Sequence, residues 1–140
     1  MSEIVVGYDG SDSGKVAVDA AVALAKGLGD GVVFVFGYAP PGIWGGEIAE
    51  HEEAIEELGE KVLGKAREQA AAVGTEVRQQ LVPKRAVEAL IEVADEHDAR
   101  MIVVGTFGEA TLKGIILGSN TNKLLHLTDR PVLVVPAEER

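Results

Sequence analysis

The chain of 140 residues contains no cysteine, so it has neither a disulfide framework nor a site in which thiolates hold a metal. The same absence leaves the redox state of its compartment open. Basic residues are also few, because 13 lysines and arginines face 23 aspartates and glutamates, for a formal net charge of −10. So acidic a chain repels phosphate backbones and anionic lipid headgroups. We therefore expect no nucleic-acid partner.

Long apolar runs are missing as well. No stretch approaches the ~18 residues of a membrane span, and Met1-Ser2-Glu3 leads into an apolar segment without a basic leader. We therefore expect no membrane insertion and a cytoplasmic location. No internal repeat or linker divides the sequence. Its length and its 46% hydrophobic content suit a single domain over residues 1–140 with a real core.

What the sequence does contain is an alternation of short apolar runs with amphipathic helical patterns. Strands are predicted at residues 4–8, 32–36, 75–81, 101–104 and 131–136, and helices at 16–28, 48–72, 86–97 and 119–127. Right-handed crossovers between such strands produce a doubly wound parallel sheet. The prediction is therefore an α/β fold with five parallel strands and four helices. The third strand is the most polar and is expected at an edge of the sheet.

The stretch from the fourth strand into the last helix carries the strongest functional pattern. The apolar residues 101–104 end at Gly105, Gly108 follows, and Gly118 with Ser119 opens a helix. Glycines let the backbone approach a ligand, and a serine can cap free N–H groups. A strand, a glycine-bounded loop and a helix start together form an anion site. An ordinary strand-to-helix loop remains the alternative, because the spacing matches neither general phosphate fingerprint.

The chain resembles the universal stress protein family. Its nucleotide-binding members carry a glycine, two residues, a glycine, nine residues, a glycine and then serine or threonine, as do Gly105, Gly108, Gly118 and Ser119 here. The resemblance extends from the opening strand with Asp9-Gly10-Ser11 to the closing residues 130–136. It implies the strand order 3-2-1-4-5, in which strands one and four are neighbours where the winding reverses. Ligands of such sheets bind outside the carboxyl ends of the strands at that point.

The resemblance also implies which residues bind an adenine nucleotide. Asp9 would hold ribose hydroxyls or help to place a hydrated metal, with a turn cap shared with Ser11 as the open alternative. Gly37 would read the base edge through its main chain, although the family usually has an apolar side chain there. The remaining expected residues, in and around the phosphate loop, are Val104, Gly105, Gly108, Gly118, Ser119, Asn120 and Thr121. Asn120 stands where the family usually has valine. ATP, AMP or cyclic AMP is the expected ligand, with Mg²⁺ accompanying it.

Catalysis is less expected than binding. A hydrolase needs a positioned base or a cation on the terminal phosphate, and this region offers only Lys113 and Lys123, neither with the fixed placement of a phosphate-loop lysine. We therefore expect at most slow hydrolysis and name no catalytic residue. His97-Asp98 is interpreted as a charge at a helix C-terminus rather than as a catalytic dyad.

Two further segments contain residues that could belong to a metal site or to a lid over a pocket. His51 is close in sequence to Glu47 and Glu50, but adjacent helical positions point apart, so no metal site is predicted. Residues 43–46 carry the only tryptophan and no periodicity. They form either a lid over a pocket or a packing anchor, and packing is the favoured interpretation.

Three functions follow from these patterns. The first is an adenine-nucleotide-binding sensor whose ligand orders the loop from Gly105 to Ser119 and alters a surface for an unidentified protein partner. The second is a nucleotide-free interaction module, and the third, ranked last, is a slow ATP hydrolase.

The final strand predicts an assembly. Residues 131–136, which begin at Pro131 and end at Pro136, are apolar between the prolines and in the implied order lie at an edge of the sheet. A second copy that pairs about a two-fold axis would cover that edge, which predicts a homodimer. The alternative is that residues 137–140 fold over it.

Overall fold

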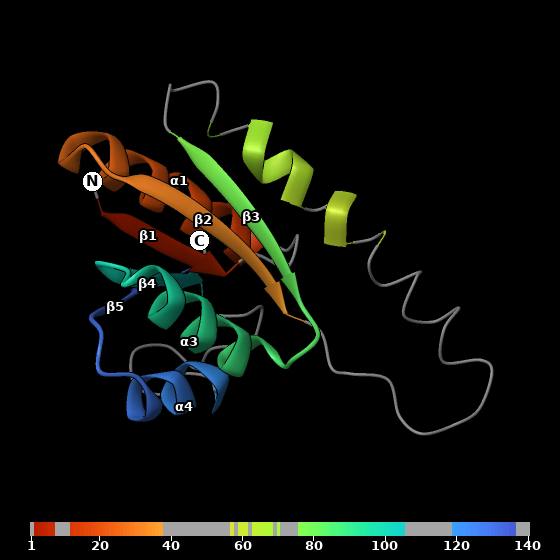
Figure 1. The fold of residues 1–140 in the computed structure, drawn as a ribbon, viewed down its shortest axis with the longest axis vertical. Coiled ribbons are helices and arrows are strands. Elements are labelled where there is room, and N and C mark those ends of the chain that lie inside the picture. The colour runs from red at the N-terminus through yellow and green to blue at the C-terminus, as the bar shows by residue number, and fades with distance from the viewer. Residues whose placement is uncertain are drawn as a thin grey trace.

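The computed structural model contains one parallel five-stranded sheet in the order β3-β2-β1-β4-β5 (Figure 1). The strands are β1 (Glu3–Gly7), β2 (Gly31–Gly37), β3 (Val77–Val82), β4 (Met101–Gly105) and β5 (Val132–Val135). The structure describes residues 2–7, 12–37, 57, 59–61, 63–68, 70, 76–105 and 119–136, with only the backbone of 12–14 and 119–120. The predicted doubly wound order is confirmed, with β3 and β5 at the two edges.

The helices are α1 (Asp12–Leu28), α3 (Ala86–His97) and α4 (Ser119–Leu127), and residues 57, 59–61, 63–68 and 70 are helical as well. The predicted bounds of α3 and α4 are confirmed to the residue. The last strand is shorter than predicted because its ladder stops inside the two prolines, which lack the N–H that a ladder bond needs. Within the described ranges, every helix falls short of the length and apolarity that a membrane crossing demands.

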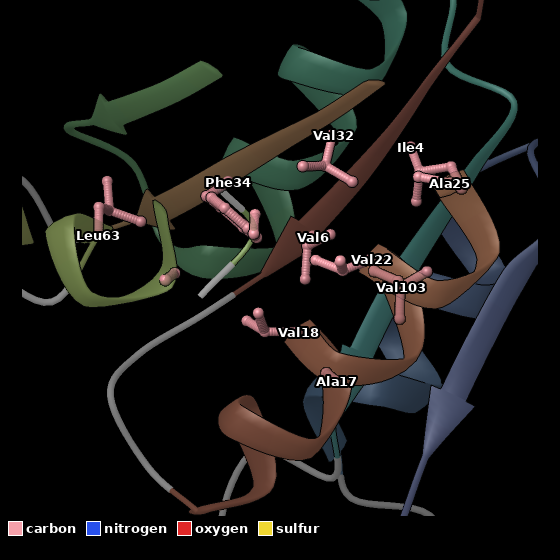
Figure 2. Packing of buried hydrophobic residues seen from close by; sticks show 13 residues of the cluster. Ile4, Val6, Ala17, Val18, Val22, Ala25, Val32, Phe34, Leu63 and Val103 are labelled. Atoms are coloured by element: carbon pink, nitrogen blue, oxygen red, sulfur yellow. The ribbon is translucent and has the colours of Figure 1, made fainter. Parts of the chain in front are cut away.

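The central strands are buried on both faces. On one face, α1 and the helical residues Leu63, Ala66 and Ala70 pack against the core side chains of three strands, namely Ile4, Val6, Val32, Phe34 and Val103 (Figure 2). On the other face, α3 and the α4 residue Leu124 pack against those of Val5, Val33, Val35, Ile102 and Val104. Each strand therefore sends alternate side chains into a different core, as a parallel sheet covered by two helix layers requires. The winding reverses between β1 and β4, because α1 and α3 cover opposite faces.

The amino ends of the strands are held by polar pairs. Arg100 precedes β4 and donates from Nε to Asp30 Oδ2 at 2.5 Å, while its backbone N–H donates to the carbonyl of Glu3 at 2.8 Å. The Asp30 side chain is 2% exposed and that of Arg100 is 43% exposed. The Arg100 hydrogen bond keeps the pKa of Asp30 below its ordinary value of 3.8 and outweighs desolvation, which acts in the opposite direction. This pair joins the chain segments that enter β2 and β4.

Asp30→Asn is expected to lower the free energy of unfolding by about 1 to 2 kcal/mol at neutral pH, since solvent screens the half-exposed Arg100. The folded-state pKa of Asp30 lies below the unfolded one. The pair therefore stabilises the fold above about pH 4 and loses that effect as the pH falls through the folded pKa. Urea titrations should show the two proteins converging in acid. A constant difference at all pH values would contradict the assignment, and Glu68→Gln, at an exposed helical position, is the matched control.

Candidate functional site

The carboxyl ends of β1 and β4 form the topological switch point. β1 ends at Gly7 and β4 at Gly105, and the two strands are paired in the register that sets Val6 beside Val103. On its other side β4 is paired with β5, with Gly105 opposite Val135. Since α4 leads from β4 back to the start of β5, its N-terminus lies at this same edge of the sheet. The end of β4 and the start of α4 thus lie at the same end of the sheet, where the glycine pattern predicts an anion site.

Thr121 is the most informative residue of this site. It lies in the first turn of α4, is only 1% exposed, and its Oγ1 has no hydrogen-bond partner within the described part of the chain. An unpaired buried hydroxyl costs about 1 to 3 kcal/mol. The first N–H groups of a helix also lack intrahelical acceptors, and the helix dipole makes this end positive. No acidic residue in the first turn of α4 offsets that potential. Hydroxyl and amide donors together suit an anionic oxygen ligand.

The structure describes the other predicted site residues to different extents. The Val104 side chain is fully buried in the core beneath α3, so only its main chain can contribute to a site at the strand end. For Ser119 and Asn120 the structure describes backbone alone, as the first residues of α4. Asp9, Gly108 and Gly118 lie outside the described residues, as do Lys113, His51 and residues 43–46.

Gly37 ends β2 at the same edge and is glycine for a packing reason. A Cβ added there would lie 2.9 Å from three atoms, Ala86 Cα, Ala89 Cβ and the Lys84 carbonyl oxygen. Two of these atoms belong to the backbone and cannot move cheaply. The start of α3 therefore rests directly on the end of β2, which leaves no room for a larger residue at position 37.

Two lysines near this edge are paired with carboxylates. Lys123 of α4 donates to Glu88 of α3 at 2.9 Å, and this bond lowers the pKa of Glu88. Lys84 donates to Glu92 at 2.6 Å. Through this bond the Lys123 ammonium joins α4 to α3. Sequence reasoning missed both carboxylates, because nothing in their spacing indicates a cross-helix pair.

His97 has partners that the sequence did not indicate. Its Nδ1 lies 2.8 Å from Glu3 Oε1, and its Nε2 lies 2.9 Å from Gln80 Nε2. Asp98 instead ends α3 with φ 48° and accepts a bond from Arg130. The two neighbours thus make different contacts, and His97 is the basic residue in the last turn of α3. Among the described residues no group of three or more His, Asp or Glu side chains could hold a metal ion.

These features define the class of the protein: a doubly wound α/β domain with a candidate anion site at the switch point. The sequence pattern of the Universal stress protein family matches residues 1–136. The chain belongs to this family.

Relatives and solved structures resemble the chain over nearly its whole length. A universal stress protein of Thermus aquaticus is 34% identical over 134 residues, covering 94% of this chain and 96% of its own. The crystal structure of a universal stress protein in complex with cAMP has a TM-score of 0.74 and 30% identity, and covers 98% of both chains. A universal stress protein from Archaeoglobus fulgidus in complex with dAMP has a TM-score of 0.74 and 26% identity, covering 96% of this chain and 98% of its own.

Gly37→Ala is expected to destabilise the fold by about 1 to 3 kcal/mol, because an overpacked site must displace the start of α3. Gly27→Ala in α1 is the matched control, since a Cβ there meets nothing within 4 Å. That control should gain about 0.5 to 1 kcal/mol from the helical preference of alanine. Urea unfolding of both variants measures the contrast, and equal stabilities would contradict the packing explanation.

Proposed function

We propose that this universal stress protein is cytoplasmic and binds an adenine nucleotide, with ATP as the first candidate. The phosphates lie against the N-terminus of α4 and the glycine-rich stretch after β4. The observation that carries the proposal is the buried, unpartnered hydroxyl of Thr121 beside the free N–H groups of that helix start. A nucleotide phosphate supplies the missing acceptor. The cAMP and dAMP complexes of similar proteins support an adenine ligand.

The proposed contacts come from residues at the carboxyl ends of the strands. Main-chain groups of Val104, Gly105, Gly108 and Gly118 line the phosphates, and Ser119, Asn120 and Thr121 present the start of α4. Gly37 contacts the base through its main chain, since its surroundings leave no room for a side chain. Asp9 holds the ribose hydroxyls. Main-chain donors of this kind recognise phosphate geometry without needing a positive side chain.

Mg²⁺ accompanies the nucleotide in this proposal. The described part of the chain offers no cluster of three acidic or histidine side chains that could hold a metal. Magnesium commonly keeps several waters and binds through one or two carboxylates and the phosphates of its nucleotide. The ion would thus be recruited by the ligand. Asp9 is the carboxylate that we propose to orient its waters.

The site is proposed to bind rather than to catalyse. Phosphoryl transfer needs a cation placed on the terminal phosphate or a base on the attacking water. Lys123 is engaged with Glu88, and its ammonium is therefore committed to holding α4 against α3. Hydrolysis is slow at most. Nucleotide binding instead orders the loop from Gly105 to Ser119 and modulates a surface for a protein partner.

Thr121→Val removes the hydroxyl and keeps the side-chain shape. We expect adenine-nucleotide affinity to fall about tenfold, the effect of one lost charge-assisted hydrogen bond. Stability should be unchanged or slightly higher, because the variant also removes an unpaired buried polar group. Calorimetric titration with ATP and Mg²⁺ measures the affinity, and thermal unfolding measures the stability.

Thr121→Ser is the matched control, since it retains the hydroxyl and should bind more tightly than the valine variant. Equal affinities of all three proteins would remove Thr121 from the site. Mass spectrometry of ligand released from the purified protein identifies which nucleotide it carries. A protein that neither carries a nucleotide nor binds added ATP, AMP or cyclic AMP would instead support the nucleotide-free interaction module.

We also propose a homodimer that forms through residues 131–136. β5 pairs with β4 on one side and lies at the edge of the sheet. Its Leu133 side chain is 37% exposed, and within the described sheet the outer N–H and C=O groups of this edge strand have no neighbouring strand. Pairing with a second β5 about a two-fold axis gives the backbone groups of this edge hydrogen-bond partners and covers Leu133.

Leu133→Lys is expected to yield monomers, because it places two like charges near the two-fold axis. Sedimentation analysis at micromolar concentration measures the change. Leu28→Lys at the end of α1, where the leucine is 46% exposed, is the control and should remain dimeric. A wild-type chain that already sediments as a monomer would exclude the proposed interface.

A further inference from the structure

A groove lies between α3 and α4, at the end of α4 that is remote from the proposed nucleotide site. The helices lie side by side on one face of the sheet (Figure 1). The pair of Lys123 in the middle of α4 and Glu88 in the first turn of α3 joins the two helices. Toward the C-terminal ends of the helices lies a groove of about 330 Å³, lined by Ile91, Asp95, Leu127, Thr128, Asp129 and Arg130. This volume is at the low end of small-molecule pockets, which span roughly 300 to 1,000 Å³, and suits a few side chains.

The groove has an apolar side that is open to solvent. Leu127 is 56% exposed, the largest fraction among the large hydrophobic residues that the structure describes as exposed. Ile91 of α3 also lines the groove and is packed against the core beneath it. An aliphatic side chain placed between Leu127 and Ile91 would remove apolar surface of both from water, which is favourable in proportion to the area covered.

The charged residues around the groove determine which charge a partner should carry. Arg130 donates to Asp95 Oδ1 at 3.2 Å, to Asp98 Oδ1 at 3.1 Å and to the Ala99 carbonyl at 2.8 Å. Its guanidinium is thus surrounded by acceptors and only 22% exposed. Asp129 also lines the groove and is exposed, so the lining holds two carboxylates, with Asp98 next to it as a partner of Arg130. One guanidinium does not balance these carboxylates, so the groove is negative, attracts cations and repels anionic ligands.

We propose that this groove is a docking site for a basic segment of another protein, with an aliphatic side chain seated on Leu127 and Ile91 and a neighbouring lysine or arginine directed to Asp129. Two copies of this chain are proposed to meet along β5 rather than in this groove, whose negative charge calls for a cationic partner. The groove lies at the opposite end of α4 from Thr121. A partner and a nucleotide therefore bind without competing, and docking does not depend on the nucleotide assignment.

The test uses the isotope-labelled full chain without nucleotide. A short peptide of alternating lysine and leucine is titrated into it, and binding is followed by NMR. We expect amide shifts to concentrate at Ile91, Asp95 and residues 127–130. Leu127→Ser should weaken binding about five- to tenfold, the effect of losing part of one buried leucine contact. Asp129→Asn should weaken it less, and more strongly at low than at high salt.

Leu28→Ser is the matched control, because Leu28 is an exposed leucine on another helix, and it should bind the peptide as the wild type does. A peptide with glutamate in place of lysine should not bind. Shifts scattered over the acidic surface, or equal affinities of the Leu127 and Leu28 variants, would overturn the proposal. Either result would leave the nucleotide site untouched, since no nucleotide is present.

Discussion

The burial of β1 and β4 on both faces is the constraint from which the other features follow. Val5 and Ile102 enter one core and Val6 and Val103 enter the other, and all four are 0% exposed. Strands with two apolar faces need a helix layer on each side. Right-handed crossovers can provide both layers only if the chain winds outward in opposite directions from these strands. The opening at their carboxyl ends, where ligands of such folds bind, is therefore a consequence of how the core is packed.

The amino ends and the carboxyl ends of the strands differ in how their polar groups are paired. At the amino edge, Asp30 and Arg100 are bonded to each other, and Glu3 contacts His97. At the carboxyl edge, Thr121 keeps a buried hydroxyl without a partner in the described structure. An unsatisfied group costs about as much as a satisfied charged one contributes, on the order of 1 to 3 kcal/mol. Such a cost is tolerable in a domain if a ligand removes it, and this asymmetry separates the stabilising edge from the proposed binding edge.

α4 connects the two surfaces that we assign to ligands. Its first turn carries Thr121 and its last residue, Leu127, lines the groove against α3. The pair of Lys123 and Glu88 lies between them and fixes the helix laterally. The helix is nine residues long, so about 13 Å separates its two ends. Membership of the universal stress protein family establishes the fold, while both ligand surfaces are proposals that rest on the residues described above.

The sequence by itself determined the fold class, most element bounds and the position of the glycine-rich stretch, because apolar periodicity, turn residues and motif spacing are local properties. The strand order came from family resemblance. Tertiary structure alone decided the pairs between Asp30 and Arg100, 70 residues apart, and between Glu3 and His97, 94 residues apart. It also decided that Thr121 is buried without a partner. Contacts between distant segments depend on how helices pack on the sheet, and no local pattern of residues encodes that packing.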